Sequence, residues 1–360
     1  MNYKFLAVVG NENQNASQID TAAAKAYGID CRLSQGNLQV FVASGTPTLS
    51  VPDHGILIGR LFTKQGQPVV RDLVWDRTNV LHQRHLLENF WGEYVFIESR
   101  RENAVTLTFL RDPSGGMPCF YSVESGAGFV TSSVSLATEL GLYSREVDWD
   151  FVLHSLAYTY LKSERTGLRG LYELLPGCTL EINDSHASTR AVWSPWTFAA
   201  PDRRHMDLAE ASADVRDAVS LAVRSWAGVD RSVLLELSGG LDSSIVAACL
   251  REAEAETTCC TMVAPVPGTD ERQYARQVAA HLQFELLSAE IDLENAEFNF
   301  PPPPDSASPG MGILHHPVDS AISKVASNLG ARSLFSGAGG DSIFSYLPGA
   351  TPAADAFRES

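Results

Sequence analysis

The spacing of hydrophobic positions changes a little beyond the middle of the chain. In roughly the first 190 residues, apolar side chains occur in short runs separated by turn residues, a pattern typical of β-strands. The sequence DPSGG at residues 112–116 is one such turn. The runs predict strands over residues 5–9, 38–43, 55–62, 92–98, 105–110, 120–123 and 128–132. This part of the chain is therefore expected to form a mainly β or layered α+β domain.

Beyond residue 207 the pattern becomes an alternation of strands and helices. Asp207 can cap a helix whose apolar positions, from Leu208 to Trp226, recur at helical spacing. Strands are then expected over 233–237, 257–263, 284–291 and 333–335, and helices over 244–250, 271–282 and 318–329. Because strands and helices alternate, we expect a parallel α/β sheet. The proline-rich segment that begins at 301–304 is expected to be an insertion between these units.

A stretch that follows neither periodicity, residues 193–204, separates the two patterns. A chain of 360 residues is also longer than a single core usually organises. We therefore expect one domain over 1–195, a linker over 196–206 and a second domain over 207–360.

The charge balance limits the class of ligand. The chain has 27 Lys and Arg against 43 Asp and Glu, a formal charge of −16, which repels nucleic-acid phosphates. A general nucleic-acid binder is therefore not expected, although a pocket lined by amide N–H groups could still hold a small anion. With 44% hydrophobic and 19% charged residues, the chain is also expected to fold rather than remain disordered.

The cysteines and the apolar runs indicate the compartment. The six cysteines lack CxxC spacing, so reduced thiols are expected, with Cys259 and Cys260 packed in a buried strand. The apolar patch at 5–9 is too short for a signal peptide, and no run of about 18 apolar residues occurs. We expect a cytoplasmic protein without a membrane span.

The strongest local signal is the sequence ELSGGLDSS at residues 236–244, placed between a predicted strand and a predicted helix. Glycines there let backbone N–H groups approach phosphates, the helix N-terminus adds positive potential, and Ser238, Ser243 and Ser244 add hydroxyl groups. Asp242 would repel a bare phosphate, which implies a divalent cation between them. The GxxxxGK[ST] motif is absent, which excludes a Walker-type NTPase. A merely structural turn, capped by Ser and Asp, is the alternative.

A second glycine-rich segment, SGAGGDS at residues 336–342, also follows a short apolar strand. In a doubly wound sheet, ligands lie beyond the carboxyl ends of the strands, so both loops can face one crevice. Asp242 and Asp341 are then a candidate carboxylate pair for one Mg²⁺. Taken alone, this segment would more often be a flexible turn.

The sequence SGGLDSS resembles the pyrophosphate (PP) loop of the ATP-pyrophosphatase superfamily, whose members cleave ATP between the α and β phosphates to adenylate a carboxylate. A β-rich amino-terminal half, then SGGLDSS, Thr269-Asp270-Glu271 and SGAGGD, resembles the asparagine synthetase group within it. The resemblance implies an α+β N-terminal-nucleophile-like domain, of the class II glutamine amidotransferase type. An α/β adenine-nucleotide α-hydrolase-like (PP-loop) synthetase domain would follow it.

Two departures from the asparagine synthetase pattern narrow the resemblance. Glutamine-using members carry a cysteine directly after the initiator Met, whereas this chain has Asn2 and its first cysteine is Cys31. The first domain is therefore not expected to hydrolyse glutamine. Ala338 and Ser342 stand where the family pattern SGEGxDE has its two glutamates, which argues against asparagine synthesis.

The remaining features are similar to the lasso peptide cyclases, the asparagine-synthetase-like maturation enzymes of lasso peptides. The matching segments are WGEYV at 91–95, RDPSG at 111–115 with PCFY at 118–121, LLPG at 174–177, residues 236–244, HPVD at 316–319, and GGD at 339–341. This resemblance implies an ATP-dependent ligase that adenylates an Asp or Glu side chain of a precursor peptide. The peptide's amino terminus then closes a macrolactam.

The resemblance also implies roles for individual residues. Pyrophosphate would be held by Ser238, Gly239, Gly240, Asp242, Ser243 and Ser244. Mg²⁺ would be held by Asp242 and Asp341, which are also the implied catalytic residues. The adenosine side would be formed by Leu237, Val263, Ser336 and Gly337. The implied cofactors are ATP and Mg²⁺, and the implied partners are the precursor peptide, a leader-binding protein and a leader peptidase.

Other functions remain open on the sequence. An asparagine synthetase or a β-lactam synthetase-like amide ligase belongs to the same group, and a non-catalytic peptide-binding pseudoenzyme belongs to another class. In this family the synthetase domain continues past the second glycine loop, whereas 18 residues, 343–360, remain here. We therefore expect the C-terminal part of the second domain to be missing. Either the sequence is a piece of a longer protein, or the gene product is truncated and inactive alone.

Overall fold

The computed structural model describes most of the chain, and the chain divides into two compact units. The described residues are 3–10, 19–52, 54–73, 82–101, 105–158, 161–183, 186–230, 232–296, 301, 303–310 and 314–340. The first unit comprises residues 1–206 together with 301–310, and the second comprises 207–300 and 311–360. The segment 301–310, which the sequence placed within the second domain, thus packs with the first unit.

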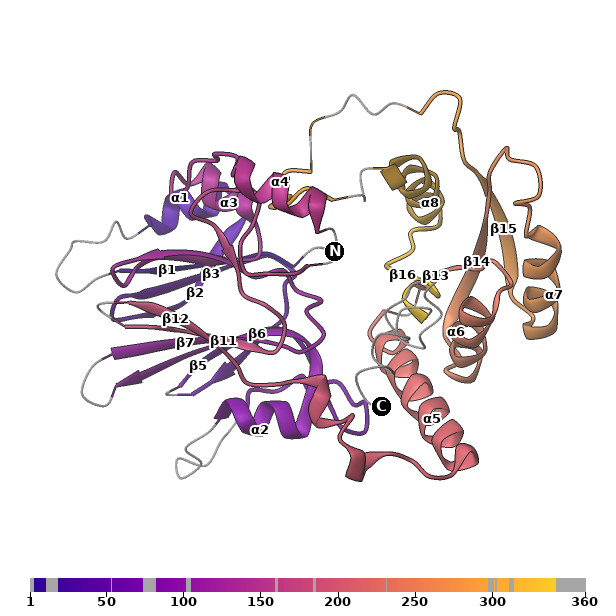
Figure 1. Ribbon diagram of the computed structural model, residues 1–360, viewed down its shortest axis with the longest axis horizontal. Helices are drawn as coiled ribbons and strands as arrows, with labels where there is room; N and C mark the ends of the chain where they lie inside the picture. Colours follow the sequence, from indigo (N-terminus) through magenta and orange to yellow (C-terminus); the bar gives the residue numbers. More distant parts are fainter. Residues whose placement is uncertain are drawn as a thin grey trace. The chain divides into compact units, whose positions relative to one another are not determined.

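Two antiparallel sheets form the centre of the first unit (Figure 1). In the described part of the chain, one sheet has the strand order β10-β8-β9-β1-β3-β2 and the other has the order β12-β11-β7-β6-β5-β4. The first sheet consists of β1 (Phe5–Val9), β2 (Ile29–Gln35), β3 (Leu38–Ala43), β8 (Phe120–Glu124), β9 (Ala127–Thr131) and β10 (Tyr172–Glu173). The second consists of β4 (Thr48–Val51), β5 (Gly55–Thr63), β6 (Phe90–Arg101), β7 (Val105–Arg111), β11 (Cys178–Ile182) and β12 (Ala187–Ala191).

Alternating side chains of these strands build three hydrophobic layers. Along β1, Phe5 and Val9 enter a core shared with Ile58 of β5 and Phe109 of β7, so the two sheets pack face to face. The other side of β1 packs against residues of α1 (Thr21–Ala26) and α3 (Val134–Glu139). Leu86 of α2 (His82–Asn89) packs on the outer face of the second sheet. The unit is therefore a layered α+β structure, the architecture expected from the sequence.

Short polar side chains begin the helices of the first unit. The carboxylate of Asp20 accepts a hydrogen bond from the Ala22 N–H at the start of α1. Asp148 does the same for Phe151 in α4 (Trp149–Ala157). Such caps satisfy N–H groups that have no partner within the helix. Two short 3₁₀ helices, η1 (Pro195–Thr197) and η2 (Pro201–Arg203), lie at the start and in the middle of the expected linker, at the end of the first unit.

Asp305 anchors the segment 301–310 within the first unit. Its Oδ1 accepts hydrogen bonds from the Ser133 hydroxyl at 2.8 Å and from the N–H and hydroxyl of Ser135 at 3.0 and 2.8 Å. Its other oxygen lies 3.5 Å from the Lys4 ammonium. The N–H of Gly167 donates to the Ala307 carbonyl at 2.8 Å. These contacts hold a segment that is remote in sequence against the first sheet's helical layer.

The second unit is a parallel α/β sheet with helices on both faces. Within the described residues, its strand order is β15-β14-β13-β16, and every pair is parallel. The strands are β13 (Ser232–Glu236), β14 (Glu256–Val263), β15 (Glu285–Glu290) and β16 (Ser333–Phe335). The helices are α5 (Leu208–Ala227), α6 (Leu241–Glu252), α7 (Arg272–Leu282) and α8 (His316–Leu329). Side chains of α5, α6 and α7 share one core with the sheet, and Ile322 of α8 packs on the opposite face.

The strand order places a topological switch point in this sheet. The chain moves outward from β13 to β14 and β15, and then returns to place β16 on the other side of β13. Leu235 of β13 pairs with Phe335 of β16, so the carboxyl ends of these two strands are adjacent. Ligands of open α/β sheets bind at such a point.

In the part of the chain that the structure describes, no helix is long and apolar enough to cross a membrane.

Candidate active site at two glycine loops

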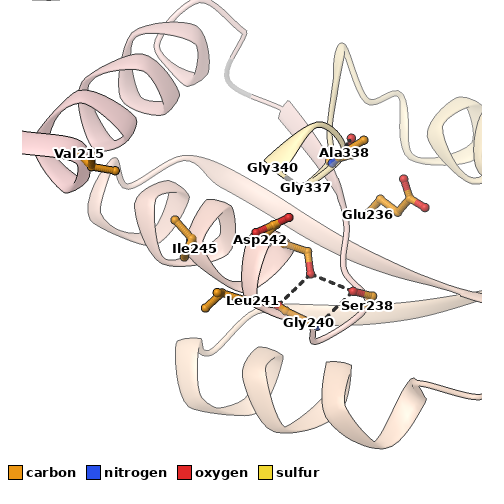
Figure 2. Close-up of a pocket in the computed structure, with 12 residues that line it drawn as sticks. Val215, Glu236, Ser238, Gly240, Leu241, Asp242, Ile245, Gly337, Ala338 and Gly340 are labelled. Carbon is orange, nitrogen blue, oxygen red and sulfur yellow. Dashed lines mark hydrogen bonds between the residues drawn. The ribbon is translucent and has the colours of Figure 1, made fainter. Parts of the chain in front are cut away.

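A cavity of about 850 Å³ opens where the loops after β13 and β16 meet (Figure 2). The residues that line it are Val215, Glu236, Ser238, Gly240, Leu241, Asp242, Ser243, Ile245, Ser336, Gly337, Ala338 and Gly340. They come from α5, from the end of β13, from both glycine-rich loops and from the first turns of α6. The two loops singled out in the sequence therefore face one crevice.

Serine hydroxyl groups shape the first loop. The Ser238 hydroxyl accepts a hydrogen bond from the Gly240 N–H at 3.1 Å and lies 3.1 Å from the Ser243 hydroxyl. The Ser243 hydroxyl also lies 3.4 Å from the Gly240 carbonyl, to which it donates. The N-cap residue of α6 is Gly240, which has no side chain to cap the helix. The start of α6 therefore presents backbone N–H groups and two hydroxyls at the cavity, an arrangement suited to phosphate oxygens.

Close backbone contacts require the glycines of both loops. Gly239 has φ +86°, and a Cβ there would lie 2.5 Å from the Ala275 nitrogen and the Tyr274 carbonyl carbon in α7. A Cβ on Gly337 would lie 2.5 Å from the backbone nitrogen of Ser243. The first loop thus packs on α7 and the second packs on the first turn of α6. Any larger residue at either position would separate these elements.

Asp242 connects the first turn of α6 with the second loop. A Cβ on Gly340 would overlap the Asp242 carboxylate, which therefore lies directly against the backbone of that loop. Asp341, the expected second ligand of Mg²⁺, follows Gly340 in sequence and lies outside the described residues. The Asp242 carboxylate, which is expected to hold the metal, therefore lies beside Gly340, the residue directly before Asp341.

The charges at the cavity suit a cation-bound polyphosphate. Glu236 and Asp242 both line it, and no Lys or Arg does so among the residues described. Two carboxylates alone would repel a polyphosphate, whereas carboxylate and hydroxyl oxygens are the ligands that Mg²⁺ prefers. The side chains present therefore fit a bound Mg²⁺, with Asp242 and Glu236 as oxygen donors. Burial, followed by the charge of Glu236, raises the pKa of the neighbouring Cys260 thiol.

Four other expected site residues are not among the described residues that line this cavity. Leu237 is fully buried in the core that α5, α6 and α7 share with the sheet, and its N–H donates to the Cys260 carbonyl at 2.8 Å. Val263 is half-buried at the carboxyl end of β14. Gly239 faces α7, and Ser244 lies in α6 with its N–H donating to the Gly240 carbonyl.

Several lining residues had no site role assigned from the sequence, although four of them lie within the two glycine-rich segments. They are Val215, Glu236, Leu241, Ile245, Ala338 and Gly340. Glu236 had a usable signal, because it is the last residue of a buried strand and directly precedes the glycine loop. The three aliphatic residues had none, because Val215 and Ile245 each fit the apolar face of a predicted helix and Leu241 lies inside the loop motif.

A second cavity of about 640 Å³ adjoins the first and shares Val215, Asp242, Ile245 and most of the second loop with it. Its further lining is largely aliphatic and comes from α5 and α6: Leu208, Ala211, Val219 and Val246, with Ser212, Arg216, Ser220, Cys249 and Gly339 between them. The polar end of the site, which suits phosphate groups, thus continues into an apolar wall. Such a wall suits an aromatic base or an apolar part of a substrate.

The segment Thr269-Asp270-Glu271 forms the start of α7. Asp270 accepts hydrogen bonds from the Arg272 N–H at 3.0 Å and from the Arg272 guanidinium at 2.6 to 3.0 Å. The hydrogen bond from the Arg272 side chain is the main reason that the pKa of Asp270 falls to about 2. Because the pair is exposed, we assign it to shaping the helix start rather than to strong stabilisation.

Comparison with known proteins finds similarities that include the second unit. Residues 214–357 match the family described as asparagine synthase. Carboxyethyl-arginine beta-lactam-synthase of Streptomyces clavuligerus is 36% identical over 122 residues, which cover 32% of this chain and 22% of that protein. The amidase chry2 of Gibberella zeae is 26% identical over 280 residues, which cover 70% of this chain and 39% of that protein. The chain thus spans less than half the length of these curated relatives.

Solved structures give weaker likenesses. An NH3-dependent NAD synthetase from Campylobacter jejuni, in complex with a nitrate ion, is 16% identical, with 34% of this chain and 54% of that chain covered and a TM-score of 0.26. A glutamine-dependent NAD+ synthetase from Acinetobacter baumannii, in complex with ADP, is 17% identical, with 49% and 32% covered and a TM-score of 0.29. These scores are too low to establish a shared fold. What the comparisons establish is the match of residues 214–357, most of which lie in the second unit, to the asparagine synthase family.

Proposed function

We propose that this chain is an ATP-dependent amide ligase that activates a carboxylate as its adenylate. The observation that carries the proposal is the single cavity formed by both glycine loops, where the side-chain-free N-cap of α6, the Ser238 and Ser243 hydroxyls and the Asp242 carboxylate meet. Amide and hydroxyl donors at a helix start suit the phosphates of a nucleotide. The asparagine-synthase match covers the same residues.

Each residue of the cavity has a proposed role that follows from its chemistry. The hydroxyls of Ser238 and Ser243 and the N–H groups at the start of α6 would hold the pyrophosphate portion of ATP, with Ser244 and Gly239 supporting the loop. Asp242, with Glu236 and with Asp341 from outside the described residues, would hold Mg²⁺. A bound Mg²⁺ would neutralise charge on the phosphates as pyrophosphate leaves. The protein's contribution is positioning and charge stabilisation, because the adenylate itself is already activated.

The adjoining apolar wall offers a place for the rest of the nucleotide or for the acceptor. Ser336 and Gly337 line both cavities, and Val263 lies at the carboxyl end of β14. We propose that these three residues contact adenosine through backbone atoms. Leu237 would contribute through its backbone alone, because its side chain is buried in the core.

We further propose that the amide formed is the macrolactam of a lasso peptide. Support comes from the sequence segments WGEYV, RDPSG, LLPG and HPVD, from Asn2 at the position of the glutamine-using cysteine, and from Ala338 and Ser342. A precursor peptide would supply both the Asp or Glu carboxyl and the attacking amino terminus. On this proposal a leader-binding protein and a leader peptidase are the partners, and the enzyme acts in the cytoplasm.

A β-lactam synthetase-like activity is the second candidate, and the 36% identity to the Streptomyces clavuligerus enzyme favours it. Both candidates use the same adenylation and differ in the distance between carboxyl and amine in the substrate. An experiment with two substrates separates them. The full gene product is incubated with ATP and Mg²⁺, and with either trimmed precursor peptides that carry an internal Asp or Glu or the small β-amino acid substrates of β-lactam synthases.

The lasso proposal expects a peptide product lighter by one water by mass spectrometry, with equimolar AMP. Cyclisation of the small β-amino acid alone would overturn the lasso assignment and keep the ligase. If ATP is turned over with neither the peptides nor the small β-amino acids, both assignments are wrong. Absence of any Mg·ATP binding would support a peptide-binding protein without catalysis.

A further inference from the structure

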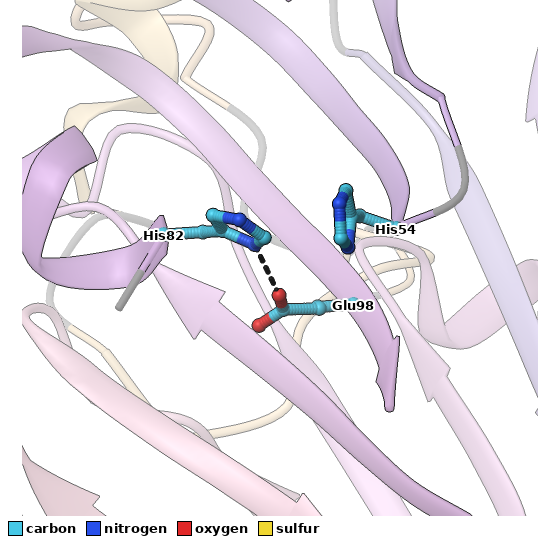
Figure 3. Close-up of side chains that lie close together, drawn as sticks. All are labelled: His54, His82 and Glu98. Carbon is cyan, nitrogen blue, oxygen red and sulfur yellow. Dashed lines mark hydrogen bonds and ion pairs between the residues drawn. The ribbon is translucent and has the colours of Figure 1, made fainter. Parts of the chain in front are cut away.

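Three metal-ligating side chains from separate segments meet inside the first unit (Figure 3). His54 lies in the turn between β4 and β5, His82 begins α2, and Glu98 lies in β6. One ligand atom from each residue lies within 4.8 Å of the other two. The glycine loops and the asparagine-synthase-like domain do not include any of these residues.

The geometry of the group is close to that of a three-ligand metal site. Nδ1 of His82 lies 2.6 Å from Oε1 of Glu98, and the rings of His54 and His82 meet edge to face with their centroids 4.3 Å apart. Figure 3 shows the two imidazoles on either side of the Glu98 carboxylate, from different segments. Around a tetrahedral Zn²⁺ with bonds of about 2.0 to 2.1 Å, ligand atoms stand roughly 3.3 Å apart. Side-chain rotations that move the 2.6 Å pair apart, toward this spacing, would therefore complete the site.

Backbone hydrogen bonds hold two of the ligands in register. The Ser99 N–H, next to Glu98, donates to the His54 carbonyl at 3.0 Å, and the His54 N–H donates to Val51 at 2.9 Å. Gly55 pairs with Glu98 across the sheet, and a Cβ at this glycine would overlap the Ile97 carbonyl. The turn that carries His54 is therefore fixed against β6. Ligands placed on rigid neighbouring elements lose little freedom when a metal binds.

The burial and charge of Glu98 favour a cation. Its side chain is fully buried, and His82 is 5% exposed. Oε2 of Glu98 lies 2.9 Å from the Arg100 guanidinium, but among the described residues it has no partner in hydrogen-bond geometry. A buried carboxylate is costly unless charges and hydrogen bonds compensate it fully. A metal ion at this position would supply both charge and directed bonds.

We propose that His54, His82 and Glu98 bind a divalent transition-metal ion of the Zn²⁺ class. Two imidazole nitrogens and one carboxylate oxygen are the donors that Zn²⁺ and its neighbours prefer, whereas Mg²⁺ and Ca²⁺ prefer sites made of oxygen alone. Three protein ligands leave a fourth position for water. The ion would join the β4–β5 turn, α2 and β6, and thereby stabilise the second sheet against its outer helix.

The test is metal titration of the full chain after chelator treatment. We expect one equivalent of Zn²⁺ by calorimetry and mass analysis, a higher thermal unfolding midpoint with Zn²⁺, and visible absorption of bound Co²⁺ typical of four or five ligands. Glu98→Gln and His82→Gln should weaken Zn²⁺ binding by at least about 100-fold, because each removes a direct ligand. Millimolar Mg²⁺ should not compete.

Matched variants separate a metal site from a structural His–Glu pair. His85→Gln removes an imidazole from the same helix but outside the group, and Asp242→Ala removes a carboxylate of the glycine-loop cavity; both should keep one Zn²⁺. His54→Gln alters a half-buried turn residue and serves if the His82 or Glu98 variants fail to fold. No saturable Zn²⁺ binding by the wild type overturns the proposal. Equal binding by His54→Gln and the wild type overturns it as well.

Discussion

At the scale of single residues, the structure makes its clearest predictions for glycines and cysteines. The sequence indicates that residues 238–240 form a phosphate loop, because SGG follows a buried strand. The sequence does not indicate which atoms contact each glycine. Contact between Gly239 and the backbone of α7 depends on how two segments more than 30 residues apart pack together. That distance in sequence is why the contact could not be predicted.

Replacement of Gly239 by alanine should destabilise the second unit more than the same change at Gly268. Both have positive φ, +86° and +85°, so both substitutions carry the left-handed backbone penalty of about 1 kcal/mol. Only at Gly239 would the new Cβ also meet backbone, 2.5 Å from Ala275, whereas Gly268 has open space. Urea unfolding should therefore show an additional loss of at least about 1 kcal/mol for Gly239→Ala. Equal losses for the two variants would contradict the packing of this loop on α7.

Two buried thiols should resist alkylation in the folded protein. Burial raises the pKa of Cys119 and of Cys259 to about 12, with a smaller contribution at Cys259 from Cys260. Because the thiolate is the reactive form, neither thiol should react at about pH 8. Half-buried Cys31 is the internal comparison. Peptide mass spectrometry after brief iodoacetamide treatment should find Cys31 modified first, and labelling of Cys259 at the same rate would speak against its burial.

At the scale of elements, most interior strands of the two antiparallel sheets could be predicted, whereas their edge strands and the interior strand β11 could not. The strands expected at 5–9, 55–62 and 92–98 correspond to β1, β5 and β6, which lie inside the two sheets. The strands that the sequence left unassigned include all four edge strands of the two antiparallel sheets: β2, β4, β10 and β12. In the parallel sheet, the edge strands β15 and β16 were both predicted. Edge strands are short and partly exposed, so their hydrophobic signal is weak. Residues 187–191, with the sequence ASTRA, have almost no apolar signal at all.

The anchor of segment 301–310 should weaken in acid. Burial alone would raise the pKa of Asp305, but hydrogen bonds from Ser135 and Ser133 and the charge of Lys4 together lower it. A carboxyl whose pKa is lower in the folded than in the unfolded state stabilises the fold at neutral pH, and that contribution is lost as the pH falls through the folded pKa. Asp305→Ala should therefore lower the thermal midpoint at about pH 7 and have less effect at about pH 3.5. Exposed Asp202→Ala is the control, and a pH-independent loss at Asp305 would exclude this carboxylate as the anchor.

At the scale of the whole molecule, the sequence indicated two units and a crevice between loops after parallel strands. The structure has one compact unit over residues 1–206 with 301–310 and another over 207–300 with 311–360. The alternation of strands and helices predicted a parallel sheet, but not the strand order that places β16 beside β13. The return of 301–310 to the first unit could not be predicted, because a proline-rich segment carries no signal for the surface on which it packs. The anchor, Asp305, is a single polar residue inside that segment.

The central claim is that Asp242 and the two glycine loops form an adenylating site. The most direct measurement is the nucleotide product when the full-length gene product turns over Mg·ATP with its carboxylate substrate. The account predicts AMP and pyrophosphate, with at least about 100-fold slower formation by Asp242→Ala and wild-type rates by Asp217→Ala, an exposed carboxylate on α5. ADP and phosphate as the products, or full activity of a folded Asp242→Ala variant, would contradict it.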